Sequence, residues 1–439
     1  MRIAIVLQPL DRVDLPFTHG SSLAIVGYNF ARELASAGHE IILYCGGKED
    51  GRVQEEGNLK VVTIHTPLDK AFKLADRVTG ICEISPPLMT RKSYFASYFK
   101  RVAQALADDT FDIVHVSTYF QFMPIFREAA PEAALLLHMH GETASMAPSS
   151  VLEPALPAID LAIGCSQFIV DRLVEAAPAL ASRNAVLWNG VDHVGEDDAP
   201  VEDAPRPLAH RLLFVGRLSP EKGMHVLIEA FNDVARRRED VVLDLVGSAG
   251  LLPYSFHVGV SDDPIDATLR PFYGKSLPNK LYRQILANQK AFLVDLKAML
   301  DPALIKRVNF RGALPHDTVH DLYAASTIVV FPSVWNEPFG MPVAEAMAAG
   351  VPVISTDSGG IPEITDGNTA GILVPRGDAA SLARAIDDLL DAPERRRQLS
   401  IEGLKRMRAH FTWPVLTRQL EAIYECAIEL RQTAPVTAA

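Results

Sequence analysis

A segment in the last quarter of the chain, Asn336–Ile364, reads NEPFGMPVAEAMAAGVPVISTDSGGIPEI. Proline is favoured in the first turn of a helix, where its missing N–H has no intrahelical partner, so we expect a helix over Pro342–Ala349. An apolar strand is expected over Val351–Ile354, followed by a glycine turn at Ser358–Gly360. A helix that leads directly into a buried strand is the repeating unit of an α/β fold with a parallel sheet.

Two carboxylates frame the start of this helix, Glu337 in the preceding loop and Glu345 inside the helix. The helix start offers free N–H groups and a partial positive charge, which favour phosphate. Gly340 lets a ligand approach the backbone closely. A nucleotide diphosphate sugar, with phosphate in its middle and hydroxyls at both ends, would match this arrangement. The alternatives are a helix-capping role for Glu345 and a solvated loop position for Glu337.

The same alternation of strands and helices runs along the rest of the chain in two series. The first begins with a buried strand at Arg2–Gln8 and a helix at Leu23–Ala37, and the second with a strand at Arg211–Val215. Further strands are expected at Glu40–Cys45, Leu59–His65, Asp112–Val116, Ala133–His138, Leu161–Cys165, Ala185–Trp188, Val241–Val246, Val308–Arg311, Ile328–Phe331 and Gly371–Val374. Such series imply two doubly wound domains whose ligands bind beyond the carboxyl ends of the strands.

Chain length and a change in composition predict where the domains divide. The 439 residues exceed one ordinary core. Residues 193–209 are acidic and rich in proline, as is typical of a linker. We therefore expect a first domain over 1–192 and a second over 210–413. The default ligand site of two such domains is the cleft between them.

The connection over residues 249–305 is long for a sheet of this kind. We expect a loop over Gly250–Ser276 and a helix near Leu281–Leu300. Connections of this length are often functional, and this one is a candidate for contact between copies of the chain in a homo-oligomer.

An amphipathic helix with aromatic and basic side chains is expected over Arg91–Leu106. Such a helix can lie on an anionic membrane surface. The alternative is that Tyr94, Phe95, Tyr98 and Phe99 pack on the sheet while the charges face water. We favour packing, because the chain as a whole is acidic.

The net charge of −12 argues against a general nucleic-acid partner, since such proteins usually carry a basic excess. The four cysteines form no C-x-x-C pair, so we interpret them as reduced core thiols of a cytoplasmic protein. No apolar run reaches the roughly 18 residues of a membrane span. The apolar run at the N-terminus is too short for the usual pattern of a signal peptide.

Two cations follow the first strand of the second series, in the sequence GRLSPEKG at Gly216–Gly223. Arg217 and Lys222 lie between a strand and a helix, where they could neutralise a diphosphate and stabilise it as a leaving group. The alternative is ordinary surface charge, including an ion pair with Glu221.

Both motifs, the E-P-F-G-x-x-x-x-E of the opening segment and the G-R-L-x-x-E-K-G around Arg217, resemble retaining glycosyltransferases of the GT-B fold, the group called family 4. The resemblance implies two Rossmann-like domains facing across a cleft. It also implies that the final helix crosses back, so that about 414–439 belong with the first domain.

The resemblance also implies a donor site. Glu345 would hold the ribose hydroxyls and Glu337 would lie beside the sugar. Phe339, Gly340 and Met341 would offer backbone N–H groups to sugar or phosphate.

In the first domain the resemblance points to His140 and Gly20. His140, which precedes a glycine, would lie near sugar and acceptor, while His138 and His115 are weaker candidates. Gly20 would bring its backbone to the diphosphate, although the chain has His19 where many family members have a second glycine.

The reaction that the resemblance implies is sugar transfer from a nucleotide diphosphate sugar, with UDP as the expected nucleotide, and with retention of anomeric configuration. No metal and no cofactor are expected. The acceptor stays open between a carbohydrate, a glycolipid precursor and a small molecule. A sugar-nucleotide epimerase of the same architecture and a non-catalytic sugar-nucleotide-binding partner are the alternatives. The intact set of Arg217, Lys222, Glu337 and Glu345 argues against the second of these.

Overall fold

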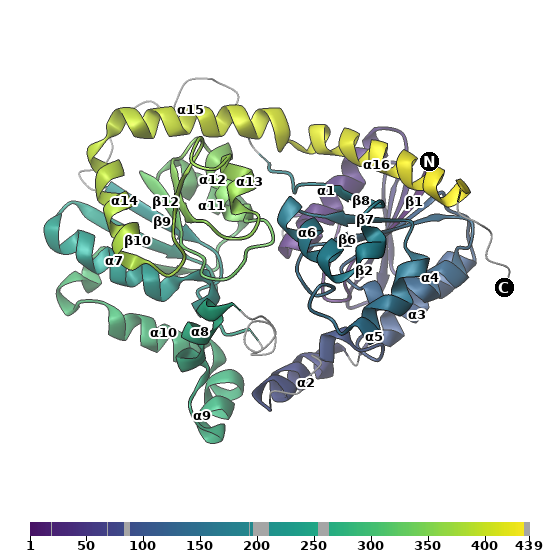
Figure 1. Ribbon diagram of the computed structural model, residues 1–439, viewed down its shortest axis with the longest axis horizontal. Coiled ribbons are helices and arrows are strands. Elements are labelled where there is room, and N and C mark those ends of the chain that lie inside the picture. Colours follow the sequence, from purple (N-terminus) through teal and green to yellow (C-terminus); the bar gives the residue numbers. More distant parts are fainter. Residues whose placement is uncertain are drawn as a thin grey trace. The chain divides into compact units, whose positions relative to one another are not determined.

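The structure is a computed structural model that describes residues 1–18, 20–67, 69–82, 88–192, 194–195, 210–252 and 263–433. The chain divides into two compact units, and each is described by itself (Figure 1). Unit 1 consists of Met1–Ala75, Ser85–Gly190 and Trp413–Ala439, and unit 2 of Asp76–Ile84 and Val191–Thr412. His19 and nearly all of the expected linker over 193–209 lie outside the described residues.

Unit 1 is built on an eight-stranded sheet in the order β3-β4-β2-β1-β5-β6-β7-β8. Its strands are β1 (Arg2–Val6), β2 (Glu40–Gly46), β3 (Val53–Glu56), β4 (Leu59–Ile64), β5 (Ile113–Ser117), β6 (Ala134–Met139), β7 (Leu161–Gly164) and β8 (Asn184–Val186). All neighbours pair in parallel except β3, which pairs antiparallel with β4 at the edge. We did not predict β3, because its largely exposed sequence VQEE lacks an apolar pattern.

Helices cover both faces of this sheet. They are α1 (Ser22–Ser36), α3 (Ala96–Ala107), α4 (Met123–Ala129), α5 (Ser149–Leu152), α6 (Gln167–Ala176) and α16 (Trp413–Thr433), and α2 (Asp69–Ile81) follows β4. The last helix, α16, packs beside α1, and its residues Trp413, Leu416 and Leu420 join the core that Ile3 and Ile5 of β1 form (Figure 1). The prediction that the final helix returns to the first domain is therefore confirmed.

The aromatic segment before β5 packs inward. Tyr94, Phe95, Tyr98 and Phe99 are all buried, and the Tyr98 hydroxyl donates to the Leu7 carbonyl at 3.1 Å. The helix itself begins only at Ala96, because Phe95 adopts a left-handed conformation with φ of 57°. The packing interpretation of this segment is confirmed, and a membrane role for its aromatic side chains is wrong.

Unit 2 is built on a six-stranded, fully parallel sheet in the order β11-β10-β9-β12-β13-β14. Its strands are β9 (His210–Val215), β10 (Val241–Val246), β11 (Val308–Gly312), β12 (Ile328–Phe331), β13 (Val353–Thr356) and β14 (Ile372–Val374). The strand order reverses between β9 and β12, so the loops that follow these two strands form the place where such sheets bind ligands.

Helices surround the second sheet as well. They are α7 (Met224–Arg237), α8 (Pro264–Tyr273), α9 (Leu277–Leu281), a π-helical turn (Tyr282–Leu286), α10 (Asn288–Met299), α11 (His316–Ala324), α12 (Met341–Ala348), α13 (Ile361–Thr365), α14 (Ala379–Asp391) and α15 (Pro393–His410). The expectation of a loop over Gly250–Ser276 is wrong at Pro264–Tyr273, which form α8. Asp263 caps α8 and Pro264 opens it, and Leu269 and Tyr273 are fully buried.

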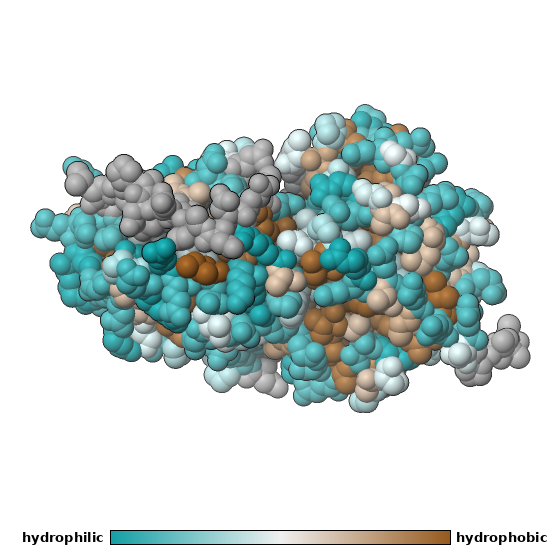
Figure 2. Space-filling view, turned by 90° about the horizontal axis from the view of Figure 1, so that it is seen from above, coloured by the Kyte–Doolittle hydropathy of each residue, from teal (hydrophilic) through white to brown (hydrophobic). Residues whose placement is uncertain are grey.

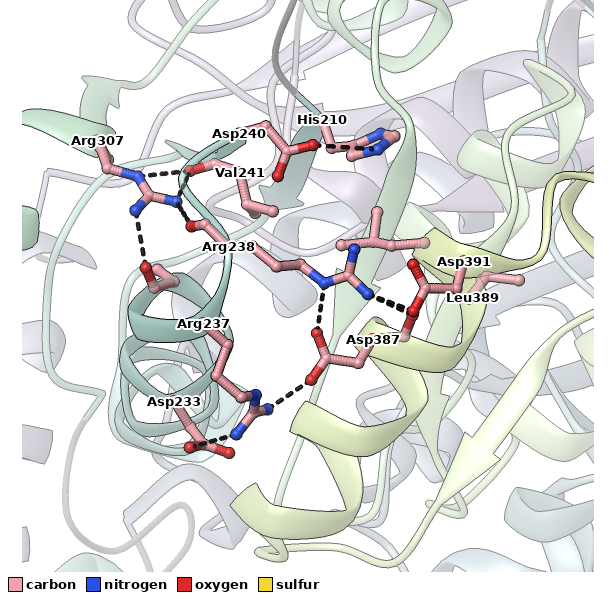
Figure 3. A network of polar contacts seen from close by, with 12 residues as sticks. His210, Asp233, Arg237, Arg238, Asp240, Val241, Arg307, Asp387, Leu389 and Asp391 are labelled. Carbon is pink, nitrogen blue, oxygen red and sulfur yellow. Dashed lines mark hydrogen bonds and ion pairs between the residues drawn. The ribbon is translucent and has the colours of Figure 1, made fainter.

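An ion-pair network joins α7 to α14 at the edge of unit 2 (Figure 3). Arg238 Nε donates to Asp387 Oδ1 at 2.8 Å, and Arg237 Nη2 donates to Asp387 Oδ2 at 2.5 Å. Arg238 also donates to Asp391, one turn further along α14. Asp387 therefore holds α7 and α14 together.

The surface gives three further facts. The face in Figure 2 is mostly hydrophilic, with small hydrophobic areas between polar side chains. Across the residues described, no helix combines the length and the apolar character that crossing a bilayer requires. Cys45 and Cys165 are buried, but Cys82 and Cys426 are exposed, so the expectation of four core thiols is wrong for two of them.

Candidate functional site

The turn after β9 is shaped by two glycines in the left-handed region. Gly216 has a φ of 144°, and Gly223 a φ of 70°. A Cβ on Gly223 would lie 1.7 Å from the carbonyl oxygen of Pro332, which follows β12. Glycine is therefore required for this close approach, and it brings Lys222 against the loop that carries Glu337.

Lys222 and Glu337 form a buried ion pair in this loop. Lys222 Nζ lies 2.5 Å from Glu337 Oε1, and the same oxygen accepts from Trp335 Nε1 and Ser333 Oγ, each at 2.7 Å. Glu337 is only 4% exposed. The alternatives of a solvated Glu337 and of a surface Lys222 are therefore wrong.

The second glycine turn fixes the backbone of Glu337. The Glu337 N–H donates to Ser358 Oγ at 3.2 Å, and the Gly360 N–H donates to the Glu337 carbonyl at 2.8 Å. Gly359 has a φ of 53°, and a Cβ there would lie 2.1 Å from the Glu337 oxygen. Ser358–Gly360 therefore serves as the support of Glu337.

Glu221 is a buried carboxylate beside Arg217. It is fully buried and accepts from Ser219 Oγ at 2.5 Å, and Arg217 Nη1 lies 3.9 Å away. Its backbone carbonyl accepts from the Val334 N–H at 3.0 Å, which joins the two loops again. Arg217 therefore does form the ion pair with Glu221 that the sequence offered as an alternative. The Arg217 side chain nevertheless keeps 36% of its surface exposed.

The start of α12 presents backbone donors. Gly340 has a φ of 116° and precedes the helix, and no side chain caps it. Within the described residues, no hydrogen bond from the N–H of Phe339, Gly340 or Met341 is found. Orphan N–H groups at a helix start suit an anion or a sugar oxygen. The capping role considered for Glu345 is wrong.

Glu345 instead accepts a hydrogen bond from a buried tyrosine. The Tyr323 hydroxyl of α11 donates to Glu345 Oε2 at 2.9 Å. Burial, and then the charge of Glu345, raise the pKa of Tyr323 well above its ordinary value. The phenol therefore stays protonated and holds one carboxylate oxygen, while Glu345 itself is half-buried.

In unit 1 three histidines form a chain, one on β5, one on β6 and one directly after β6. His115 Nδ1 lies 2.8 Å from the hydroxyl of Tyr424 on α16, and His115 Nε2 lies 3.1 Å from His138 Nδ1. The rings of His138 and His140 stack with centroids 4.0 Å apart. Burial lowers the pKa of His115 to about 4 and, together with the charge of His115, that of His140 to about 3. All are therefore neutral near pH 7.

Gly20 lines a hollow of unit 1 with a volume of about 730 Å³. Arg12 and Lys48 line the same hollow, and the loop leads into α1, whose cap Ser21 accepts from the Ala24 N–H at 3.1 Å. Arg12 and Lys48 were not predicted as site residues, because isolated surface cations carry no motif. Trp335 and Ser333, which hold Glu337, were also not predicted, because neither belongs to the two motifs.

Among the residues that the structure describes, no group of three or more His, Cys, Asp or Glu side chains is arranged to hold a metal ion. The structure thus brings Arg217, Lys222, Glu337 and the start of α12 together at the carboxyl edge of one sheet. Gly20 and His140 lie in the other unit.

Two family models match the chain in succession. Residues 23–194 match "Glycosyltransferase Family 4", and residues 208–406 match "Glycosyl transferases group 1". The match boundaries follow the division into the two sheets.

Two curated relatives are similar over most of their length. The spore coat protein SA of Bacillus subtilis is 26% identical over 75% of this chain and 82% of its own. The phosphatidyl-myo-inositol mannosyltransferase of Mycobacterium leprae is 25% identical over 77% of this chain and 79% of its own.

Solved structures share the architecture. Sucrose-phosphate synthase from Thermosynechococcus elongatus has a TM-score of 0.63 at 21% identity and covers 97% of this chain and 98% of its own. Anabaena HepE in complex with UDP and glucose has a TM-score of 0.63 at 17% identity, covering 96% and 98%. With both family models, the two sheets and these neighbours in agreement, the chain belongs to the family 4-type glycosyltransferases of the GT-B fold.

Proposed function

We propose that this glycosyltransferase moves a sugar from a UDP-sugar to an acceptor hydroxyl with retention of anomeric configuration and without a metal ion. The observation that carries the proposal is the placement of the Lys222–Glu337 pair beside the unpartnered N–H groups that open α12. A cation, a carboxylate and backbone donors meet there at a strand-order reversal.

The leaving group is a nucleoside diphosphate, so the reaction needs positive charge where that group departs. In the proposal Arg217 and Lys222 contact the diphosphate. Lys222 is held by Glu337 before the donor arrives, which keeps its ammonium in position at little further entropic cost. Glu221 holds Arg217 in the same way.

The two carboxylates address opposite ends of the donor in this proposal. Glu337 accepts from hydroxyls of the sugar, helped by the N–H groups of Phe339, Gly340 and Met341. Glu345, which the Tyr323 hydroxyl orients, accepts from the ribose hydroxyls. Each carboxylate is fixed by neighbouring donors, so little reorganisation accompanies binding.

Unit 1 contributes two residues to the proposal, Gly20 at the diphosphate and His140 near the sugar and acceptor. His140 is neutral because burial lowers its pKa, so it can accept as well as donate a hydrogen bond. The acceptor hydroxyl attacks the face from which the diphosphate leaves, and its proton passes to a departing phosphate oxygen. The bond from the anomeric carbon to the diphosphate oxygen breaks as the bond to the acceptor oxygen forms.

The choice of UDP rests on similarity. The solved Anabaena HepE complexes hold UDP and UDP-glucose, and their fold matches this chain. Names of relatives cover acceptors as different as an inositol lipid and a lipopolysaccharide, so they select none.

The test has two stages. Thermal unfolding is first measured with UDP, GDP, ADP and their sugars, because a ligand that binds the native state raises the melting temperature by mass action. The donor so identified is then incubated with candidate acceptors, and the anomeric configuration of the product is read by NMR. A shift with UDP and an α-linked product from an α-linked donor are expected. An epimer of the donor without transfer, or an inverted product, would overturn the proposal.

A further inference from the structure

The segment after α8 exposes large apolar side chains. Leu277 is 57% exposed, Tyr282 54% and Leu286 79%, and Leu281 is exposed as well. They lie on α9 and on the π-helical turn that follows it. These elements project from unit 2 beyond α8 and α10 (Figure 1).

This projection is anchored to the rest of unit 2. Arg283 Nε donates to the Phe272 carbonyl at 2.7 Å, and its guanidinium pairs with Asp295 of α10. Gln284, only 1% exposed, donates to the Tyr273 carbonyl at 3.2 Å. One side of the turn is therefore fixed by buried contacts. The apolar side chains on the other side of the turn therefore contact water, and this exposure of apolar surface costs free energy.

The charge of this region is opposite to that of the chain. Residues 264–299 carry six Lys or Arg and two Asp, a net charge of +4, whereas the whole chain carries −12. Lys275 and Lys290 are exposed on either side of the apolar residues, and Lys280 lies among them half-buried. We call Leu277, Leu281, Tyr282 and Leu286, together with these three lysines, the α9 patch.

Two kinds of occupant would cover an apolar surface with a basic border. A second copy related by a two-fold axis would place the patch against itself. Lysines would then face lysines, and the neighbouring Asp295 is already paired with Arg283. An anionic lipid surface has the complementary charge. It accepts apolar side chains at the boundary between headgroups and acyl chains, while lysines reach the headgroups.

We propose that the α9 patch docks unit 2 on an anionic lipid surface. Leucine and tyrosine side chains enter the interface, and the three lysines contact phosphate groups. The docking is peripheral and reversible, because four apolar side chains and a few cations give an affinity that salt weakens. It stands independently of the donor and the acceptor proposed above.

Flotation of the full chain with lipid vesicles tests this proposal. Vesicles of phosphatidylcholine alone are compared with vesicles that contain about 30 mol% phosphatidylglycerol. We expect binding to the anionic vesicles, and a loss of about tenfold or more in affinity in the variant Leu281→Asp/Leu286→Asp. Lys275→Glu/Lys290→Glu is expected to lose a similar amount, and added salt to weaken the wild type.

The matched control is Ile401→Asp, which alters a 37% exposed apolar side chain of α15 outside the patch and is expected to bind as the wild type does. Circular dichroism and the thermal shift with nucleotide verify that each variant is folded. Absence of binding to anionic vesicles, equal binding to neutral ones, or unchanged binding by the patch variants would overturn the proposal. Self-association that Leu281→Asp/Leu286→Asp abolishes, without vesicle binding, would assign the patch to a second copy instead.

Discussion

Lys222 Nζ lies 2.5 Å from Glu337 Oε1, although 115 positions separate the two residues in the chain. The ammonium also lies 5.1 Å from the centre of the Trp335 ring. The pair couples the loop after β9 to the loop after β12, so a change at either residue is felt by the other.

Replacing either partner tests the site. Lys222→Ala and Glu337→Ala are each expected to reduce transfer by about 100-fold or more, because positive charge at the leaving group or a contact to the sugar is lost. Each change also leaves a buried charge unpaired and should lower the free energy of unfolding by about 3–5 kcal/mol. Steady-state kinetics and thermal unfolding measure the two effects.

Lys306→Ala is the control for Lys222→Ala, because Lys306 is an exposed lysine of the same unit. It should change neither activity nor stability appreciably. Full transfer activity in a folded Lys222→Ala or Glu337→Ala protein would show that the site is assigned incorrectly.

Two glycines of unit 2 offer a steric test of the support under Glu337. Gly359 and Gly367 both have positive φ, but a Cβ on Gly359 meets the Glu337 backbone at 2.1 Å, whereas one on Gly367 has nothing within 4 Å. Gly367→Ala should cost about 1–2 kcal/mol of stability and keep activity. Gly359→Ala should cost more and also weaken donor binding, as titration with UDP would reveal. Equal effects of the two changes would contradict the role assigned to Ser358–Gly360.

The hydrogen bond from Tyr323 to Glu345 can be removed without changing a charge. Tyr323→Phe removes a donor that orients the carboxylate, so nucleotide affinity should fall by about tenfold or more, the value of one hydrogen bond to a charged group. The turnover of bound donor should change little, because Glu345 is assigned to the ribose. Isothermal titration with UDP measures the expected loss of affinity, and steady-state kinetics show whether KM or kcat changes. A loss confined to kcat would contradict the assignment of Glu345 to the ribose.

The buried histidines make stability depend on pH. Burial lowers the pKa of His115 to about 4 and places that of His138 well below its ordinary value. Both rings are neutral when folded, but in the unfolded chain they take up protons below about pH 6.5. The free energy of unfolding is therefore highest above about pH 6.5. It decreases as the pH falls toward 4, by up to about 1.4 kcal/mol per pH unit for each histidine.

His115→Gln removes one of these groups. Between pH 7 and pH 5, the free energy of unfolding of this variant should therefore decrease by about 2 kcal/mol less than that of the wild type. Urea unfolding at both pH values measures the difference. His410→Gln, at an exposed position of α15, is the control. Parallel curves for the wild type and His115→Gln would contradict the burial of a neutral ring.

Local patterns determined much of the fold. Apolar runs such as Ile328–Phe331 and Val241–Val246 indicated the strands. A parallel strand is buried on both faces, so its own sequence is a nearly continuous apolar run. The edge strand β3 and the helix α8 escaped prediction. The strand β3 is largely exposed and lacks an apolar pattern, and α8 depends on the burial of Leu269 and Tyr273 in the folded unit.

The sequence by itself determined the donor motifs, the glycines that open their turns and the family. Which charges pair was decided by tertiary structure. The role of Glu337 was open from the sequence until the fold placed it against Lys222. The loop that carries Trp335 likewise meets Lys222 and the carbonyl of Glu221 only in the folded chain. The reason is physical. A turn or a strand follows from a few neighbouring residues, whereas the partner of a buried charge is set by segments that the sheet order brings together.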